Sequence, residues 1–457
     1  MGLRSPLEQL FDEVIDRGLC THCGTCAGLS SGGLALSQTR AGMLPVRPAD
    51  GSFELPPEAV EACPGRGLNY PSLTKFVFGR QPGNWLLGNY EDIWVGHSNS
   101  AALRRNGSSG GVITHTLAYL LQEGRIDGAV VLRHGFPEPW LSSPIIATTL
   151  DEIIASSQSV YVPVPVNAIL QQMDEFPGRL AYVGLPDQVA SLRRLQQLGH
   201  RGAKKVKYVI GPYVGTLIYL QGLESFLSSS GIGGLKDVKS LQYRAGEWPG
   251  NLVVESRDGR RIQAKKFYYN YLIPFYITKS TLYSPDFANE LTDLSIGDAW
   301  SPEYEAKGAG FSVVIARSPA AAEIMGEMRV KGMLELEELP LNKALEMHGH
   351  MLDFKKRGSY IRMSWRKATG RIVPDYGIKP INIPLSRYLV EGVISGVILA
   401  CQTRLARFVV GLVPLAIIGP LFDGLRKTWK WLSKPTKRRA LMDLTFEPTD
   451  TPREVET

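Results

Sequence analysis

The sequence has few cysteines and no long apolar run near its N-terminus. Only five of its 457 residues are cysteine, and four of these lie within residues 20–63. This clustering fits ligation of a metal or a cluster in a reducing compartment better than a disulfide framework. Because the first residues also lack the apolar core of a secretory signal, we expect a cytoplasmic protein.

Acidic residues are scarce in one segment near the C-terminus, and that segment accounts for the positive net charge of +7. Residues 404–439 contain nine Lys or Arg and one acid, Asp423, a surplus of eight that leaves the rest of the chain at −1. The rest of the chain, with a net charge near zero, lacks the excess of positive charge that is typical of nucleic-acid-binding domains. We therefore expect no nucleic-acid partner.

The pattern along the chain predicts four parts. Residues 1–75 hold the clustered cysteines in loop-rich sequence, residues 76–175 and 176–375 alternate helix and strand patterns, and residues 376–457 form a tail. The expected fold class is α+β or mixed α/β. A small N-terminal module would precede a mixed-sheet body and a helical C-terminal tail.

Some local signals are specific enough to place individual elements. Ser5 and Glu8 fit a capping box, with Pro6 at the first helical position. Apolar residues spaced at i, i+4, i+7 and i+8 predict a helix that follows residue 111 and ends at Gly124. The Asp-Gly pair at residues 258–259 predicts a hairpin turn.

The tail combines two short apolar runs with clustered cations. The runs 388–401 and 408–422 are shorter than the roughly 20 residues that a spanning helix needs, and LRKTWKWLSKPTKRR follows them. Cations mixed with tryptophan favour peripheral attachment to anionic lipid, at the inner face of the cell membrane. The alternative is a pair of core or dimer helices followed by a solvated basic tail.

The cysteines in CTHCGTC, which are Cys20, Cys23 and Cys26, need a fourth ligand to complete a tetrahedral site. Cys63 in EACPG is the best candidate, because cysteine followed by proline commonly ends a cluster-binding run. Structural zinc usually uses two C-x2-C pairs, so three cysteines in one loop favour a [4Fe-4S] cluster over zinc. Cys401 lies in the apolar tail and is interpreted as a small buried residue.

A Gly/Ser-rich turn, NGSSGGVITH, stands directly before the helix expected after residue 111. It places Ser109, Gly110 and Gly111 at the helix N-terminus, where backbone N–H groups and the helix dipole favour a phosphate. A turn of this composition can also serve only as a helix cap.

Taken together, these segments resemble the coenzyme F420 hydrogenase/dehydrogenase beta-subunit family, to which 7-hydroxymethyl chlorophyll a reductase is related. The matching stretches cover roughly residues 15–300 in the family's order: CTHCGTC with EACPG, GSSGGVITHTLAYLLQEGRIDGAVVL, SQSVYVPVPVN, YVGLPDQVASLRRL, KVKYVIGPYVG and SPDFANELTDLSIGDAW. The resemblance implies an oxidoreductase with one [4Fe-4S] cluster and FAD. Electrons would come from a ferredoxin-like donor or a partner redox subunit, and would pass to a small organic substrate such as a deazaflavin or a tetrapyrrole.

The resemblance also implies which residues lie at the flavin and which could donate a proton. The flavin residues would be Ser109, Gly110, Gly111, Thr114, Ser159, Tyr161, Gly184, Gln188, Ser295 and Gly297. Asp187 and Asp298 would be the candidate acids. Each could instead serve structure, Asp187 as a helix cap and Asp298 as a cap or a turn hydrogen-bond acceptor.

The sequence departs from the family at five positions. The resemblance implies cysteine ligands of a second, flavin-proximal cluster at four positions, which are occupied here by Asp187, Val214, Thr281 and Ser284. Only one cluster is therefore expected. Gln158 replaces a glycine usual in its loop. The alternative function is a non-catalytic or electron-transfer accessory protein of a membrane assembly, such as one for polysaccharide biosynthesis.

Overall fold

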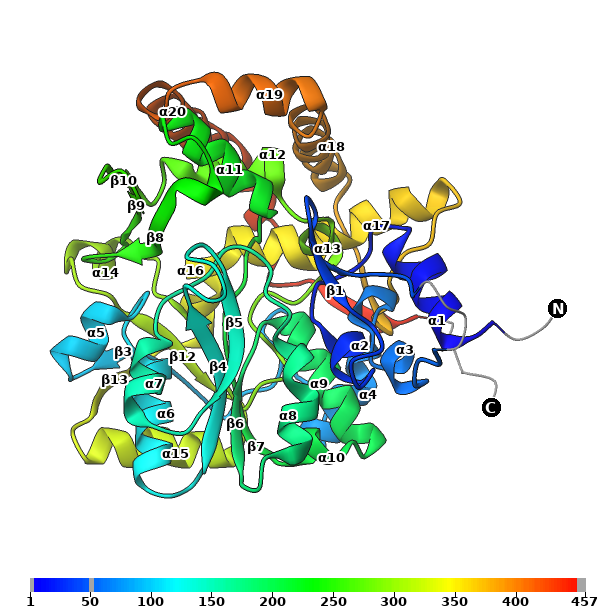
Figure 1. Cartoon of the computed structure of the whole chain (residues 1–457), viewed down its shortest axis with the longest axis vertical. Helices are drawn as coiled ribbons and strands as arrows, with labels where there is room; N and C mark the ends of the chain where they lie inside the picture. Colours follow the sequence, from blue (N-terminus) through cyan, green and yellow to red (C-terminus); the bar gives the residue numbers. More distant parts are fainter. Residues whose placement is uncertain (1–3, 49–52, 450–457) are drawn as a thin grey trace.

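The centre of the protein is a mixed sheet of eight strands (Figure 1). The computed structural model describes residues 4–48 and 53–449. The strand order is β13 (Leu334–Glu338), β3 (Asp92–Ser98), β12 (Ser312–Ala316), β11 (Leu294–Asp298), β7 (Val206–Pro212), β6 (Leu180–Val183), β4 (Gly128–His134) and β5 (Ser142–Ala147). Strands β11, β7, β6 and β4 run parallel, and the outer pairs are antiparallel. The mixed α/β class is confirmed, and strands from both expected middle parts share this sheet.

Helices cover both faces of the sheet because its strands are apolar on both sides. Ala129 and Val131 of β4 face the layer formed by α6 (Val112–Gln122), α7 (Leu150–Ala155) and α15 (Pro319–Val330). Val130 between them faces α4 (Tyr70–Phe78), α8 (Leu170–Glu175) and α9 (Pro186–Leu198). The helix expected after residue 111 is α6, and Gly124 follows it at φ 61°.

The N-terminal module begins with the expected capped helix. The Ser5 N–H donates to the Glu8 carboxylate at 2.8 Å, and the Glu8 N–H donates to the Ser5 hydroxyl at 3.3 Å. The helix α1 (Pro6–Gln9) runs into a π-helical turn, η1 (Leu10–Ile15), and α2 (Thr25–Gly28) and α3 (Glu58–Glu61) follow. A short hairpin, β1 (Leu36–Thr39) and β2 (Gly42–Pro45), lies where only loop was expected.

A smaller layer of helices and strands stands beside the main sheet. Strands β8 (Val238–Ala245), β9 (Asn251–Ser256) and β10 (Arg261–Lys265) form an antiparallel sheet, and the expected hairpin turn at residues 258–259 joins the last two. Helices α11 (Leu220–Ser229), α12 (Leu272–Tyr276) and α13 (Lys279–Tyr283) complete this layer. Short connecting helices are α5 (Ala101–Asn106), α10 (Arg201–Lys204), α14 (Pro302–Ala306), η2 (Pro64–Arg66), η3 (Val166–Ile169), η4 (Leu235–Asp237) and η5 (Tyr269–Tyr271).

The C-terminal part is helical, as expected. It comprises α16 (Leu341–Asp353), a π-helical turn η6 (Phe354–Gly358), α17 (Ser359–Ala368), α18 (Leu385–Cys401), α19 (Arg404–Leu412) and α20 (Leu415–Arg438). Strands β14 (Ile378–Ile381) and β15 (Thr445–Pro448) pair antiparallel. Among the helices that the structure describes, none alone has the length and apolar character needed to cross a bilayer. The pair α18 and α19 meets those criteria only together, bent by 73°.

Candidate functional site

Four cysteine thiols converge on one cavity in the N-terminal module. Cys20, Cys23 and Cys26 come from the CTHCGTC loop, and Cys63 comes from the segment between α3 and η2. Leu10, Val14, Ile15, Leu36, Met43, Pro45 and Ala59 line the same cavity. The fold therefore brings together the four cysteines expected as ligands, inside a largely apolar wall.

The loop can turn this tightly because of Gly24. Its φ is 88°, a left-handed conformation that glycine adopts without steric cost. A Cβ at this position would lie 2.8 Å from Pro165 and from the backbone N of Ala168, so the loop also packs closely on η3. The absence of a side chain at Gly24 thus lets the loop with its three cysteines pack against η3.

Burial raises the pKa of these thiols. It raises the pKa of Cys63 to about 12, with a further contribution from Cys23, and it moves Cys20 and Cys26 in the same direction. Across the described ranges, no group of three or more His, Cys, Asp or Glu side chains is arranged to hold a metal ion. A cluster makes a different demand, because its four thiolates bind four separate iron atoms. Four convergent thiols in an apolar cavity supply the donor set for that larger group.

A chain of hydrogen bonds ties the cysteine loop to the body. The Cys23 thiol lies 3.3 Å from the Thr25 hydroxyl, which lies 2.6 Å from the Ser191 hydroxyl of α9. Asn167 donates to Thr25 at 3.0 Å and accepts from Tyr182 of β6. The orientation of Cys23 is thus set by residues far from it in the sequence.

The Gly/Ser turn at residues 107–111 packs against the end of the main sheet. The Gly110 N–H donates to the Ser312 hydroxyl of β12 at 2.9 Å, and Ser109 Oγ lies 2.5 Å from the same hydroxyl. A Cβ on Gly110 would come within 2.7 Å of the Gly96 carbonyl oxygen. The turn therefore needs glycine for packing, whatever it binds.

A pocket lies beside this turn, at the start of α6. It is lined by His97, Ser98, Asn99, Ala101, Arg104, Arg105, Gly107, Ser109, Gly246, Glu247, Trp248, Ala309 and Gly310. Arg104 donates to the Gly310 carbonyl at 3.0 Å and stands over the ring of Phe311. Arg105 pairs with Glu247 at 3.3 Å, and both line the pocket. Arg104 and the helix N-terminus are therefore the features that suit an anionic group such as a phosphate. Thr114, one turn into α6, is buried.

The 158–161 loop reaches the same turn. Ser159 donates to the Ser108 hydroxyl at 2.8 Å. Tyr161 packs edge-on against Tyr243 at 5.5 Å between centroids, and Lys266 lies 3.8 Å above its ring and donates to its hydroxyl. Burial alone would raise the pKa of Tyr161, but the neighbouring cations Lys266 and Arg244 lower it.

Gln158 has a φ of 93° in this loop. A residue with a Cβ pays roughly 1–2 kcal/mol for a left-handed backbone, and glycine avoids that penalty. We expect Gln158→Gly to raise the free energy of unfolding by up to about 1 kcal/mol, after allowing for the greater freedom of glycine in the unfolded chain. Urea denaturation measures this change. Ser157→Gly, at a negative φ, should instead be destabilising; equal losses in both variants would contradict the strain at Gln158.

Asp298, at the end of β11, is held in an ion pair. Arg244 of β8 donates to its two carboxylate oxygens at 2.9 and 3.1 Å, and the Trp248 indole donates at 2.9 Å. Burial would raise the pKa of Asp298, but Arg244 and these hydrogen bonds outweigh it and lower the pKa. Asp298 is therefore ionised at neutral pH and suited to position Arg244; its role as an acid stays a prediction.

Asp187 has the opposite electrostatics. Burial raises its pKa to about 6, against the attraction of Lys355 and a hydrogen bond of 3.0 Å from the Ser284 hydroxyl. The N-cap residue of α9 is Leu185, so Asp187 lies within the first turn and does not cap the helix. Of the two candidate acids, Asp187 is the one whose pKa is raised toward neutrality.

Four positions at which the family resemblance implies further cysteines are occupied here by Asp187, Val214, Thr281 and Ser284. Asp187 and Ser284 are in contact although they are 97 residues apart, as expected for ligands of one site. The backbone carbonyl of Thr281 accepts a bond of 2.9 Å from the buried Lys355 ammonium. Val214 donates its N–H to the Phe287 carbonyl. None of the four positions supplies a thiol, and the expectation that the chain holds only one cluster stays a prediction.

Four other residues expected at the flavin make contacts within the protein, close to the central strands of the main sheet. Gln188 accepts from the Leu185 N–H and donates to the Val164 carbonyl, both at 2.8 Å. Ser295, fully buried in β11, accepts from Arg317 at 3.1 Å. Gly184 accepts from Asn289, and a Cβ on Gly297 would lie 2.2 Å from the Tyr213 ring. The structure brings these residues near the ends of β6, β7 and β11, and their contact with a flavin stays a prediction.

Sequence reasoning missed the residues that surround Asp298 and Tyr161. Arg244 and Trp248 lie in or just after β8, and Lys266 follows β10. They are separated from Asp298 by 54, 50 and 32 residues, and no local spacing links them to it. The tryptophan in the EWPG turn was the one available signal, because a large aromatic residue in a short turn suggests a packing role.

Sequence comparison places the body of the chain in a known family. Residues 93–171 match the N-terminal segment of the family described as coenzyme F420 hydrogenase/dehydrogenase, beta subunit. Residues 178–341 match the C-terminal segment of the same family. Together these segments make up more than half of the chain.

Individual relatives agree with this. The chain is 23% identical over 384 residues to a coenzyme F420-dependent sulfite reductase of Methanocaldococcus jannaschii, covering 80% of this chain but only 55% of that relative. It is 27% identical over 259 residues to a coenzyme F420 hydrogenase subunit beta of Methanothermobacter thermautotrophicus, covering 56% of this chain and 86% of that relative.

A solved structure shares the fold. A chain of the F420-reducing [NiFe] hydrogenase complex from Methanosarcina barkeri matches with a TM-score of 0.51 and 22% identity, over 63% of this chain and 96% of that chain. The two family segments, the relatives and the shared fold lead to one conclusion. The protein belongs to the coenzyme F420 hydrogenase/dehydrogenase beta-subunit family.

Proposed function

We propose that the protein is an oxidoreductase that holds one [4Fe-4S] cluster and FAD. The observation that carries the proposal is the convergence of Cys20, Cys23, Cys26 and Cys63 on one apolar cavity. These four thiolates would hold the cluster. When bound, a cluster exchanges single electrons and a flavin combines them into pairs for an organic substrate.

Two loops would hold the flavin. The turn at residues 107–111 and the loop at residues 158–161 meet at the Ser108 and Ser159 hydroxyls. The adjoining pocket carries Arg104 beside the N-terminus of α6, and these two features would contact a pyrophosphate. Arg105 in the same pocket is paired with Glu247. Tyr161, the last residue of this loop, would lie at the flavin together with Lys266, which donates to its hydroxyl.

The relatives named for coenzyme F420 support a redox reaction with a small organic substrate. We propose a deazaflavin, a tetrapyrrole or another substrate of that size, with electrons supplied by a ferredoxin-like donor or a partner redox subunit. Of the two candidate acids, Asp187 is the better suited to hold a proton for the substrate, because its pKa is raised to about 6. Asp298 would hold Arg244 in place.

Purification without oxygen tests this function directly. We expect about four iron and four acid-labile sulfide per chain, together with extractable FAD whose visible absorbance bleaches on adding dithionite. Stoichiometric zinc without sulfide would overturn the cluster. A protein with cluster but without flavin would instead support the accessory electron-transfer role.

The pH dependence of stability tests the environment of Asp187. Its folded pKa of about 6 exceeds the ordinary value of about 3.9, so the native state holds a proton that the unfolded state has lost. This contribution is complete below about pH 4 and disappears as the pH rises through about 6. Asp187→Asn should therefore be more stable than the wild type by about 2 kcal/mol near pH 7.5, and equally stable near pH 4.

Urea denaturation at the two pH values measures this difference. Asp127→Asn is the matched control, because Arg179 lowers the pKa of the exposed Asp127 carboxyl. That variant should show no gain at the higher pH. The same profile for both variants would contradict a raised pKa at Asp187.

A further inference from the structure

Large apolar side chains are exposed along one continuous part of the protein, the helices α18, α19 and α20. Of the twenty exposed large apolar side chains of the described residues, fourteen lie on these three helices. They are Leu385, Leu389, Val393, Val397, Leu399, Leu405, Phe408, Val409, Leu412, Ile417, Leu421, Leu425, Trp431 and Leu432. We call this surface the outer face. Figure 1 shows the three helices together at the top of the view, at the opposite end from α10 and α15.

The inner sides of the same helices are also apolar and are already packed. Val410 of α19 is 3% exposed and contacts the core between α11, α12 and the second sheet, which Ile418 and Phe422 of α20 also join. Ile398 of α18 packs on Ile277 and Leu282. An amphipathic surface helix presents polar residues opposite its buried stripe, and these helices present a second apolar side instead.

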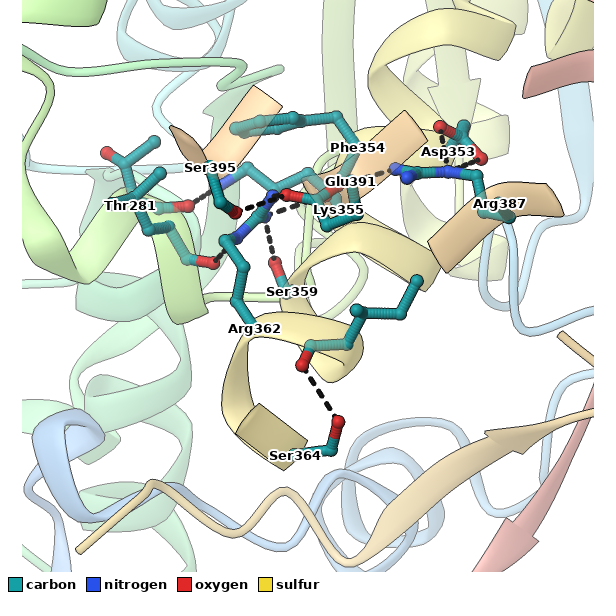
Figure 2. Close-up of polar contacts among 12 residues, drawn as sticks. Thr281, Asp353, Phe354, Lys355, Ser359, Arg362, Ser364, Arg387, Glu391 and Ser395 are labelled. Carbon is teal, nitrogen blue, oxygen red and sulfur yellow. Dashed lines mark hydrogen bonds and ion pairs between the residues drawn. The ribbon is translucent and has the colours of Figure 1, made fainter. Parts of the chain in front are cut away.

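The outer face is fixed in place by buried ion pairs. Figure 2 shows Glu391 of α18 between Arg362 and Arg387, which donate to it at 2.6 and 2.8 Å. Arg387 also donates to Asp353 of α16, and both of these side chains are fully buried. The exposed apolar side chains therefore belong to an ordered element anchored to the body.

The charges around the outer face are positive. Residues 385–439 contain two acids, Glu391 and Asp423, and both are engaged in ion pairs with neighbouring cations. Exposed cations lie along the same helices: Arg404, Lys427, Lys430, Lys434 and Arg438. Anionic phospholipids complement such a surface. A second copy of the chain would bring the same charge and would be repelled.

Other features agree with a lipid surface. Trp431 is 75% exposed beside these cations, and tryptophan is enriched at the membrane interface. The residues matched to the family end at 341, before α18 begins. The outer face therefore lies outside the residues matched to the family.

We propose that the outer face of α18, α19 and α20 seats the protein on the surface of an anionic bilayer. The apolar side chains enter the boundary between headgroups and acyl chains, and the cations contact lipid phosphates. The helices lie along the surface, in agreement with the bend of 73° between α18 and α19.

Flotation of the full-length protein with vesicles tests this contact. The vesicles are phosphatidylcholine alone, or phosphatidylcholine with roughly one third phosphatidylglycerol. We expect flotation with the anionic vesicles and a marked loss at high salt, because salt screens the headgroup attraction. Phe408→Glu with Leu412→Glu should weaken binding at least about tenfold. Lys430→Gln with Lys434→Gln should weaken it about fivefold per cation removed, on anionic vesicles only.

Val330→Glu is the matched control, because Val330 of α15 is 89% exposed and lies outside the outer face. It should float like the wild type. Equal, weak flotation of the wild type with both vesicles would overturn the proposal. So would a dimer in sedimentation equilibrium that Phe408→Glu with Leu412→Glu dissociates without any change in flotation. The lysine variants keep the test valid if the glutamate variants fold poorly, because both lysines are exposed.

Discussion

Cys63→Ser is expected to remove nearly all iron and sulfide from the anaerobically purified protein. Cys63 is separated from Cys26 by 37 residues and reaches the cavity from a different segment, between α3 and η2. It is the thiol that would close a four-ligand site. A serine hydroxyl is a poor replacement, since soft thiolates are the ligands that iron–sulfur clusters require.

The matched control for this change is Cys401→Ser. Cys401 is the fifth cysteine and lies at the end of α18, far along the chain from the cavity. We expect it to keep the full iron and sulfide content, and Cys63→Ser to keep less than about one tenth. Equal iron contents in the two variants would show that Cys63 is not a ligand. Because cluster binding also stabilises the folded module, the loss should be accompanied by a lower midpoint of thermal unfolding.

Glu391→Ala is expected to lower the free energy of unfolding by about 3–5 kcal/mol. The Glu391 carboxylate is fully buried and pairs with two arginines, Arg362 and Arg387 (Figure 2). Removing it leaves an excess of buried positive charge, with only Asp353 remaining as a carboxylate partner of Arg387. The cost comes from the arginines that lose their partner, and not from the net strength of the pairs.

Urea denaturation of the full-length chain measures this effect, with Glu447→Ala as the control. Glu447 pairs with Lys379 at 3.2 Å, but both side chains are nearly half exposed. An exposed pair contributes about 1 kcal/mol or less. If the two variants lose the same stability, the buried network does not anchor α18. We also expect the amides of α18 to exchange faster in Glu391→Ala, because the helix loses its ion pair with Arg362 of α17.

Sequence reasoning identified the elements whose signals are local. The capping box of Ser5 and Glu8, the helix that ends before Gly124 and the turn at residues 258–259 are each confirmed. Each depends on residues within a few positions of one another, so the chain carries the signal wherever it folds. The hairpin β1–β2 was missed because its strands have four residues each and little apolar alternation.

The electrostatic character of the candidate acids could not be obtained in this way. From the sequence, Asp187 and Asp298 were both candidate acids. The fold places Asp298 against Arg244 and leaves Asp187 largely desolvated. Their pKa values move in opposite directions for that reason. A pKa depends on the charges and burial around a group, and those come from residues far away along the chain.

The sequence by itself determined the cysteine set, the family, the mixed α/β class and the basic character of the C-terminal segment. Spacing, composition and periodicity are properties of the sequence itself, and they can be determined before the tertiary structure is known. Only the tertiary structure decided that the four thiols share one cavity, that Arg244 holds Asp298, and that α18 to α20 are apolar on both sides. Burial and long-range pairing exist only once distant segments have packed together, and the outer face is defined by what that packing leaves uncovered.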